Sequence, residues 1–117
     1  MRERSFEFAV RVVKLCRFLH DGGGIARTLG VQLLRSGVSI GANLEEAQAG
    51  QSRADFISKN SIALKEARET SYWLRLLAAA SVLPEQQIRE LRREAEEITR
   101  IIGAIIVSAK RNSRTRA

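Results

Sequence analysis

The sequence has one cysteine, one histidine and one proline, and these scarcities exclude several kinds of site. The single cysteine, Cys16, cannot form an intramolecular disulfide and suits a reducing compartment, so we interpret it as a small buried residue. With His20 as the only histidine, the chain has neither a Cys/His zinc set nor the two Glu-x-x-His motifs of a di-iron bundle. We therefore expect no metal and no other cofactor.

Long hydrophobic runs are also missing. No uninterrupted apolar stretch approaches the roughly 18 residues needed to cross a bilayer. Residues 1–8 mix charged and apolar side chains and contain no hydrophobic segment of the kind found in secretory signals. These absences predict a cytoplasmic protein that does not span a membrane.

Catalytic motifs are absent from the sequence as well. The glycines at 22–24 and Gly30 match neither the dinucleotide fingerprint nor the phosphate loop, so a flexible turn is the simpler interpretation. A serine triad would depend on His20, and no serine stands in a nucleophile-elbow context. The sequence therefore does not predict an enzyme.

Helix-forming residues dominate what remains. The 117 residues are 44% apolar, which suits one domain with one core, and no run of alternating β-branched residues suggests a strand. Capping and turn residues divide the chain into four predicted helices. These are a first helix from Ser5 to His20 or Asp21, a second from Ala26 or Thr28 to Ala49 with Gly50 as a left-handed cap, a third capped by Ser52 and fading near Ser81, and a fourth opened by Pro84.

Short loops make consecutive helices pack antiparallel, so the predicted fold is all-α, an antiparallel up-and-down four-helix bundle over residues 1–109, followed by a basic tail at 110–117. Residues spaced by three and four predict one buried face on each of the last three helices. These faces are Leu33, Gly37, Ile40, Leu44 and Ala47; Phe56, Asn60, Ala63, Ala67, Thr70, Leu74 and Leu77; and Ile88, Leu91, Ala95, Ile98, Ile102, Ile105 and Ala109.

Two helices carry more apolar surface than a monomeric bundle can bury. Apolar residues cover nearly the whole circumference of the first helix, and residues 101–107 widen the apolar arc of the fourth. Adjacent Tyr72 and Trp73 point about 100° apart, so at most one faces the core and the other is available as an interface anchor. We therefore expect a homo-oligomer, although tolerated exposed apolar surface is an alternative.

The net charge of +7 is concentrated at the C-terminal end. Without residues 110–117, the chain has 16 basic and 13 acidic residues, a charge of +3. Such a distribution is typical of proteins that contact a polyanion, and only six aromatic residues are available for base stacking. We expect a weakly sequence-specific nucleic-acid footprint made by Arg11, Lys14, Arg17, Arg100, Lys110, Arg111, Arg114 and Arg116.

A polar stripe runs beside the apolar face of the second helix. Ser36, Ser39, Asn43 and Glu46 recur at spacings of three and four, and Glu69 occupies a similar position on the third helix. A carboxylate close to a core needs a partner, and Arg35 or Arg68 can supply it. We interpret these side chains as a structural network between the two helices, with a ligand site as the alternative.

Residues 35–74, which include this polar stripe, resemble a known family. The residues that carry the resemblance are Asp55-Phe56, Ile62-Ala63, Glu69 and Leu74, together with Arg35-Ser36-Gly37-Val38-Ser39-Ile40-Gly41-Ala42-Asn43-Leu44-Glu45-Glu46. They look like the pattern of the four-helix bundle proteins encoded in 23S ribosomal RNA intervening sequences.

That family is in turn similar to the accessory variability proteins of diversity-generating retroelements. The resemblance implies a fivefold ring of bundles that binds RNA or DNA and associates with a reverse transcriptase. The leading hypothesis is an oligomeric, non-catalytic nucleic-acid-binding protein, and the alternative is a protein-protein scaffold in which the basic tail is incidental.

Overall fold

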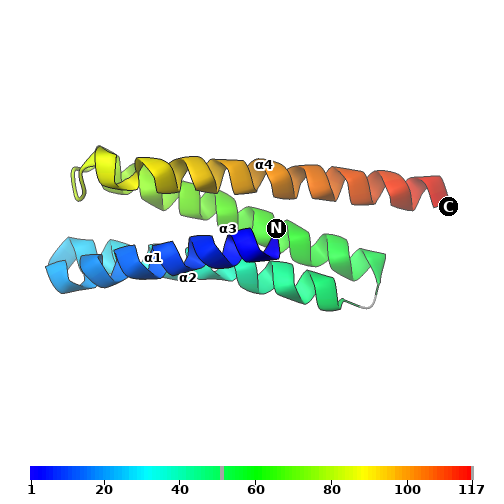
Figure 1. Cartoon of the computed structure of the whole chain (residues 1–117), viewed down its shortest axis with the longest axis horizontal. Coiled ribbons are helices and arrows are strands. Elements are labelled where there is room, and N and C mark those ends of the chain that lie inside the picture. The colour runs from blue at the N-terminus through cyan, green and yellow to red at the C-terminus, as the bar shows by residue number, and fades with distance from the viewer. Residues whose placement is uncertain (51, 117) are drawn as a thin grey trace.

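Four helices run up and down along one axis (Figure 1). The computed structural model describes residues 1–50 and 52–116, of which 113–116 are described as backbone only. The helices are α1 (Arg2–Gly22), α2 (Gly24–Ala49), α3 (Arg53–Ala79) and α4 (Glu85–Arg116). Consecutive helices pack against one another in a body of 53 × 21 × 20 Å. The predicted all-α four-helix bundle is confirmed.

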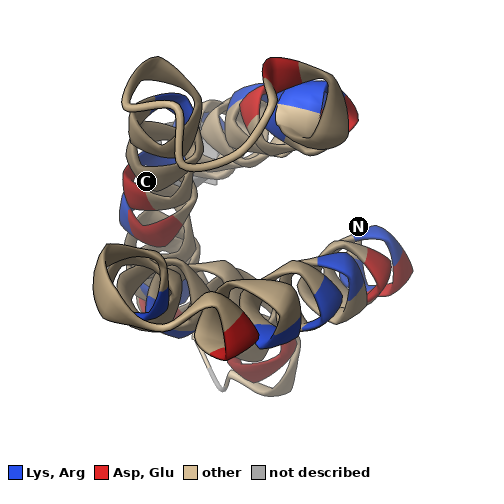
Figure 2. Cartoon of the chain, turned by 90° about the vertical axis from the view of Figure 1, so that its left-hand side faces the viewer, with Lys and Arg blue, Asp and Glu red and all other residues tan. Residues whose placement is uncertain are grey.

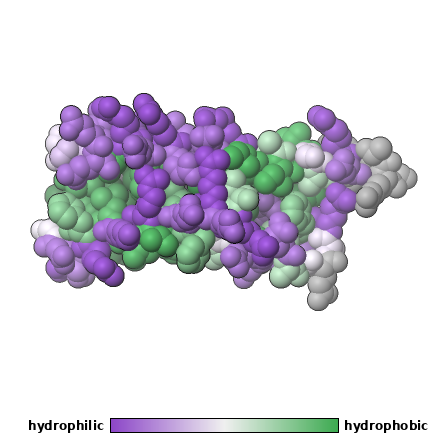
Figure 3. All heavy atoms as spheres, in the orientation of Figure 1, coloured by the Kyte–Doolittle hydropathy of each residue, from purple (hydrophilic) through white to green (hydrophobic). Residues whose placement is uncertain are grey.

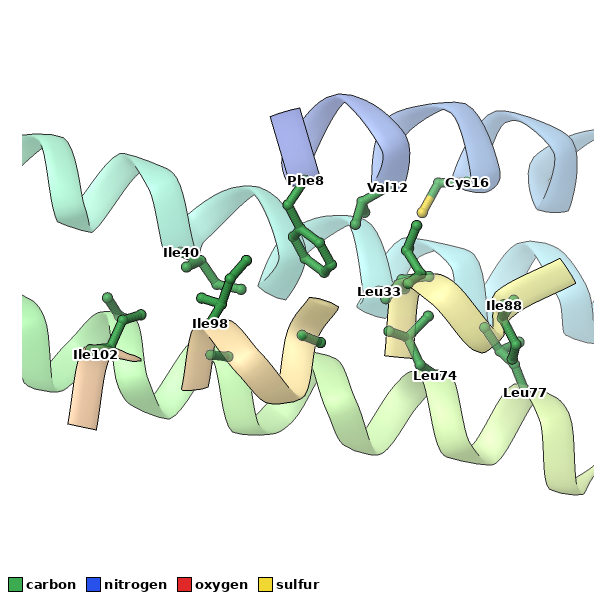
Figure 4. Packing of buried hydrophobic residues seen from close by; sticks show 14 of the residues in the cluster. Phe8, Val12, Cys16, Leu33, Ile40, Leu74, Leu77, Ile88, Ile98 and Ile102 are labelled. Atoms are coloured by element: carbon green, nitrogen blue, oxygen red, sulfur yellow. The ribbon is translucent and has the colours of Figure 1, made fainter. Parts of the chain in front are cut away.

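The core contains the apolar faces that helical spacing predicts. Phe8 and Val12 of α1 meet Leu33, Ile98 and Leu74 from the other three helices (Figure 4). The predicted faces of α2 and α3 are buried as expected, except that Phe56 is only half-buried. On α4 the prediction of Ile105 is wrong. The buried side chain there is Ile106, which lies four residues after the buried Ile102 on the same side of the helix.

Close packing of α1 against α2 depends on glycines in α2. A Cβ added at Gly37 would lie 2.8 Å from the Cγ1 atom of Val12, and one at Gly30 would lie 3.0 Å from the Cβ atom of Leu19. The missing side chains therefore let the two helices approach closely, and they explain why a helix of 26 residues retains interior glycines.

The predicted start of the first helix is wrong. Helix α1 begins at Arg2 rather than after a Ser5 cap, and Ser5 is fully buried with its hydroxyl donating to the Arg2 carbonyl oxygen at 3.0 Å. A Cβ at Gly41 would lie 3.4 Å from the Ser5 hydroxyl oxygen. Ser5 is therefore a small residue at the crossing with α2, a role that a capping pattern does not reveal.

The turn between the first two helices is shorter than predicted. Gly22 belongs to α1 and Gly24 begins α2, so the start predicted at Ala26 or Thr28 is wrong. Only Gly23 separates the helices, and it has a φ of +67°, which glycine adopts without steric cost.

The turn between α2 and α3 confirms one predicted cap and corrects the other. The Ser52 hydroxyl accepts a hydrogen bond from the Asp55 backbone N–H at 3.0 Å, as expected of an N-cap. Gly50 is extended, with φ −63° and ψ 150°, instead of left-handed. A Cβ there would lie 2.4 Å from a carboxylate oxygen of Asp55, so a larger residue would require the Asp55 side chain to move.

The last helix is longer than predicted. After the α3 helix ends at Ala79, Pro84 directly precedes α4, which then continues to Arg116. Residues 110–116, which belong to the predicted basic tail, thus continue this helix. Because α1 is 21 residues long and α4 is 32, α4 projects well past the start of α1 (Figure 1).

Helices α1 and α4 make the fewest contacts of any neighbouring pair. The ring of helices is most open between them when viewed along the axis (Figure 2). Apolar side chains are visible on this side, between hydrophilic borders (Figure 3). The bundle is therefore closed more loosely here than along its other three seams.

Candidate nucleic-acid interface

Ion pairs close the loose side between α1 and α4. The Arg4 guanidinium donates to both oxygens of Glu94, at 2.6 and 2.8 Å, and lies 3.3 Å from Glu97. Arg11 lies 3.8 Å from Glu90, which precedes Glu94 by about one turn of α4. The hydrogen bonds from Arg4 lower the pKa of the Glu94 carboxyl, although its partial burial opposes the shift.

In the described chain, more acidic than basic residues take part in ion pairs. They join seven carboxylates to only five basic side chains, because Arg4 and Arg35 each contact two glutamates. Since the whole chain has 20 basic and 13 acidic residues, pairing leaves the surplus positive charge on the surface. Lys and Arg are distributed over several helices (Figure 2).

The cations expected on the first helix form one group. Lys14 and Arg17 are exposed on α1, while Arg11 is engaged with Glu90. The side chains of this group follow spacings of three residues and so point to neighbouring parts of one helix surface.

The remaining predicted cations lie on α4. Arg100 and Lys110 are exposed, and Arg111 makes an interaction of its own. The side chains of Arg114 and Arg116 lie outside the described residues.

These two groups do not form one patch on a single chain. Helices α1 and α4 run in opposite directions from the Arg4–Glu94 pair. At about 1.5 Å per helical residue, Arg17 and Lys110 are separated by on the order of 40 Å along the axis. A single chain therefore has one basic group on α1 and a separate one on α4.

The predicted polar network is centred on Arg35. Its guanidinium forms an ion pair with Glu69 and lies 3.5 Å from a buried carboxylate oxygen of Glu66, which accepts no hydrogen bond. The Trp73 indole N–H donates to Glu69 at 3.1 Å. Glu66 and Trp73 were not predicted to belong to this network, although their spacings of three and four residues from Glu69 indicate them. Arg68 is not in this cluster.

The other residues of the predicted polar stripe do not belong to the cluster around Arg35. Ser39 and Asn43 donate to backbone carbonyl oxygens one turn earlier in α2, at 2.7 and 2.8 Å. Glu46 is exposed and pairs with Lys59 at 3.2 Å, so the expectation that it joins Glu69 in one network is wrong. Ser36 is fully buried, and its oxygen lies 2.9 Å from the Thr70 hydroxyl across the helix interface.

Tyr72 and Trp73 occupy different environments, as their angular separation predicts. Trp73 is partly buried against the core, while Tyr72 is 48% exposed. The rings meet edge to face with centroids 5.1 Å apart, and the Arg75 guanidinium carbon lies 6.0 Å from the Tyr72 centroid. Lys65 and Arg68 are exposed on the same helix. Sequence analysis did not include these cations, although their spacing indicates a shared face.

An apolar surface runs along the outside of α1 and α2. We call it the α1/α2 apolar face, and its exposed members are Phe6, Val10, Val13, Val31 and Leu34. Val13, Val31 and Leu34 line a hollow of about 250 Å³ with Gly30, Arg17 and Arg27. The side chains belong to one stripe on each helix, so the apolar area is continuous along the pair.

The described residues offer little for metal or thiol chemistry. No group of three or more His, Cys, Asp or Glu side chains gathers there in a way that would hold a metal ion. Burial raises the pKa of the Cys16 thiol to about 11, which disfavours the reactive thiolate. Across the part of the chain that is described, no helix is both long and apolar enough to traverse a membrane.

The fold and the charged surface define a class, that of small helical-bundle proteins with a basic exterior. The chain belongs to the 23S rRNA-intervening sequence protein family, whose model matches residues 1–104. It is also similar to a crystal structure of a protein of unknown function from the S23 ribosomal protein family of Bacteroides thetaiotaomicron. The two are 45% identical with a TM-score of 0.84, over 90% of this chain and 96% of that one. A search of curated proteins found no match.

Proposed function

We propose that this chain is a non-catalytic, homo-oligomeric nucleic-acid-binding protein that acts in the cytoplasm. The observation that carries the proposal is the charge balance of the surface. Among the described residues, these ion pairs occupy seven carboxylates but five basic side chains, and the net charge of the sequence is +7. Exposed Lys and Arg bind phosphates without base contacts and release counterions, so this surplus favours a polyanion.

Self-association makes the separate basic groups useful. A single chain offers one group on α1 and another on α4, and each alone would bind weakly. A ring would repeat both groups in every subunit, and linked weak contacts raise the overall affinity by a large factor. The α1/α2 apolar face supplies surface that a partner copy can bury.

The finer form of the proposal comes from the family resemblance. Similarity to the accessory variability proteins of diversity-generating retroelements favours a pentameric ring and an association with a reverse transcriptase. The family name refers to a 23S rRNA intervening sequence and the neighbour's name to a ribosomal protein family, which is compatible with RNA as the polyanion.

The experiment compares the intact chain with a truncation after Ala109. Binding of fluorescein-labelled RNA and DNA oligonucleotides is measured by anisotropy over a salt series. Loss of Lys110, Arg111, Arg114 and Arg116 should weaken binding to all sequences alike and flatten the salt dependence. An unchanged slope would remove these four residues from the interface. An intact chain that binds neither RNA nor DNA would favour the protein-protein scaffold.

A further inference from the structure

The outer face of α3 carries a compact set of cations around an aromatic ring. We call Lys65, Arg68, Tyr72 and Arg75 the basic α3 face. Their spacings of three, four and three residues place them on one side of the helix, and all four are exposed. In the described chain, no ion pair links any of its three cations to a carboxylate.

The Tyr72 ring is held in place although half of it faces solvent. Trp73 packs edge-on against it, and Trp73 is fixed by its hydrogen bond to Glu69, which Arg35 holds from α2. The guanidinium carbon of Arg75 lies over the Tyr72 ring, 6.0 Å from its centroid and within cation–π range. Tyr72 is therefore an exposed aromatic ring that contacts Trp73 and is bordered by positive charge.

A hollow beside this ring can receive a flat group. It has a volume of about 490 Å³ and lies between the end of α3 and the start of α4. Tyr72, Leu76, Ala78 and Ala79 give it an apolar floor, and Arg75, Arg92 and Glu85 border it. Because Glu85 is paired with Arg92, the nearest carboxylate is already neutralised.

We infer that the basic α3 face binds single-stranded nucleic acid, with one base stacked on Tyr72 in this hollow and the backbone following Lys65, Arg68 and Arg75. This inference rests on the proposed function and adds a site outside the predicted cations. An aromatic ring beside a row of cations is how proteins bind single strands without reading sequence. A duplex keeps its bases paired and stacked, so it can use only the charges.

Charge also argues against a second copy as the occupant. Two basic α3 faces would bring like charges together, which is unfavourable in an interface. The α1/α2 apolar face offers Val13, Val31 and Leu34 for apolar contact, with Arg17 and Arg27 at the border of its hollow. The two surfaces therefore suit different partners.

The test uses a labelled 15-nucleotide single strand and the corresponding duplex with the full-length chain. Tyr72→Leu should lower single-strand affinity on the order of tenfold, within the range for base–aromatic stacking, and leave duplex affinity unchanged. Tyr72→Phe keeps the aromatic ring, so its affinities for the single strand and for the duplex should equal those of the parent chain. Lys65→Gln with Arg68→Gln should weaken binding of both probes and reduce the single-strand salt slope by about 1.4.

The control is Arg89→Gln with Arg93→Gln, an equal charge loss at exposed positions of α4. Equal weakening by both double variants would assign the effect to net charge and overturn the inference. Single-strand binding by Tyr72→Leu that equals that of the parent would also overturn it. So would a lower oligomer mass of Tyr72→Leu or of Lys65→Gln with Arg68→Gln, because the basic α3 face would then be a subunit interface. If Tyr72→Leu does not fold, the two charge variants decide. No binding by the parent chain would instead reject the proposed function itself.

Discussion

Arg4 and Glu94 join α1 and α4, the neighbouring helices that make the least contact. The Arg4 guanidinium donates two hydrogen bonds to the Glu94 carboxylate, at 2.6 and 2.8 Å. The two residues are 90 positions apart in the sequence and lie on the side of the bundle where neighbouring helices make the fewest contacts. The start of α1 is thus tied by charge to the first half of α4, where the two helices make few contacts. Such a tie is sensitive to pH and salt, whereas the other seams depend on apolar burial.

Acid should weaken this tie in a defined pH range. The folded-state pKa of Glu94 is below its usual value of 4.5, so the unfolded chain binds that proton more tightly. The stabilisation is therefore complete above about pH 4.5 and is lost as pH falls through the lower folded pKa. Arg4→Met should lower the urea midpoint at pH 7 and abolish this part of the acid dependence.

Arg2→Met is the matched control, because Arg2 is exposed on the same helix and is in no ion pair of the described chain. Urea unfolding followed by circular dichroism at pH 7 and pH 3 measures both variants. Equal acid dependence in the parent and Arg4→Met would show that Glu94 does not carry the effect.

A methyl group at Gly37 should disrupt the packing of α1 on α2. Its Cβ would lie 2.8 Å from Val12, whose branched side chain is fully buried and has no room to move. Gly37→Ala should therefore cost about 1–3 kcal/mol, as overpacking does. Gly103→Ala is the control, since apart from the adjoining backbone of its own helix nothing lies within 4 Å of the added carbon, and it should stabilise α4 by about 0.5–1 kcal/mol. A Gly37→Ala variant as stable as the parent would contradict the close approach.

Glu69 should contribute less to stability than a buried charge would. Its partner Arg35 has a side chain that is 50% exposed and also contacts Glu66, so Arg35 is not left unpaired when Glu69 is removed. Glu69→Ala should cost about 1 kcal/mol or less and change the fluorescence of Trp73, which loses its hydrogen-bond acceptor. Glu46→Ala, which breaks the exposed pair with Lys59, should change neither. Unchanged melting with lost nucleic-acid binding would make the cluster a ligand site.

Helical spacing was sufficient to predict the four helices and most core positions, because burial follows the period of each helix. It could not predict how Ser5 is used. A serine near a helix start is normally a cap, yet here contact with Gly41 makes small size the deciding property. Such a choice depends on the neighbouring helix.

The same limit applies to the charged residues. Glu46 and Glu69 look equivalent on their helices, and only the fold assigns Lys59 to one and Arg35 to the other. The predicted cations on α1 and α4 are all positively charged, but they lie in separate places. The spacing of residues along one helix does not give the distance between residues on two different helices. The basic α3 face, by contrast, lies on one helix and was accessible to a periodicity argument.

A charge placed in the α1/α2 apolar face should break the oligomer without unfolding the chain. Val31 is 56% exposed in a single protomer, so Val31→Glu should leave the helix content unchanged. Light scattering should then show a mass near 13.1 kDa, that of one chain. Ile25→Glu introduces the same charge at a 73% exposed position of α2 outside this face and should keep the parental mass. A parent already monomeric would refute self-association.

Salt dependence of nucleic-acid binding tests the central claim most directly. The affinity of the intact chain for a labelled single-stranded RNA is measured by anisotropy over a series of salt concentrations. Surplus surface cations predict binding at low salt, with the logarithm of the affinity falling linearly with that of the salt concentration. The slope should be about −2 or steeper, corresponding to at least roughly three phosphates. No binding at the lowest salt, or binding that salt does not weaken, would contradict the account.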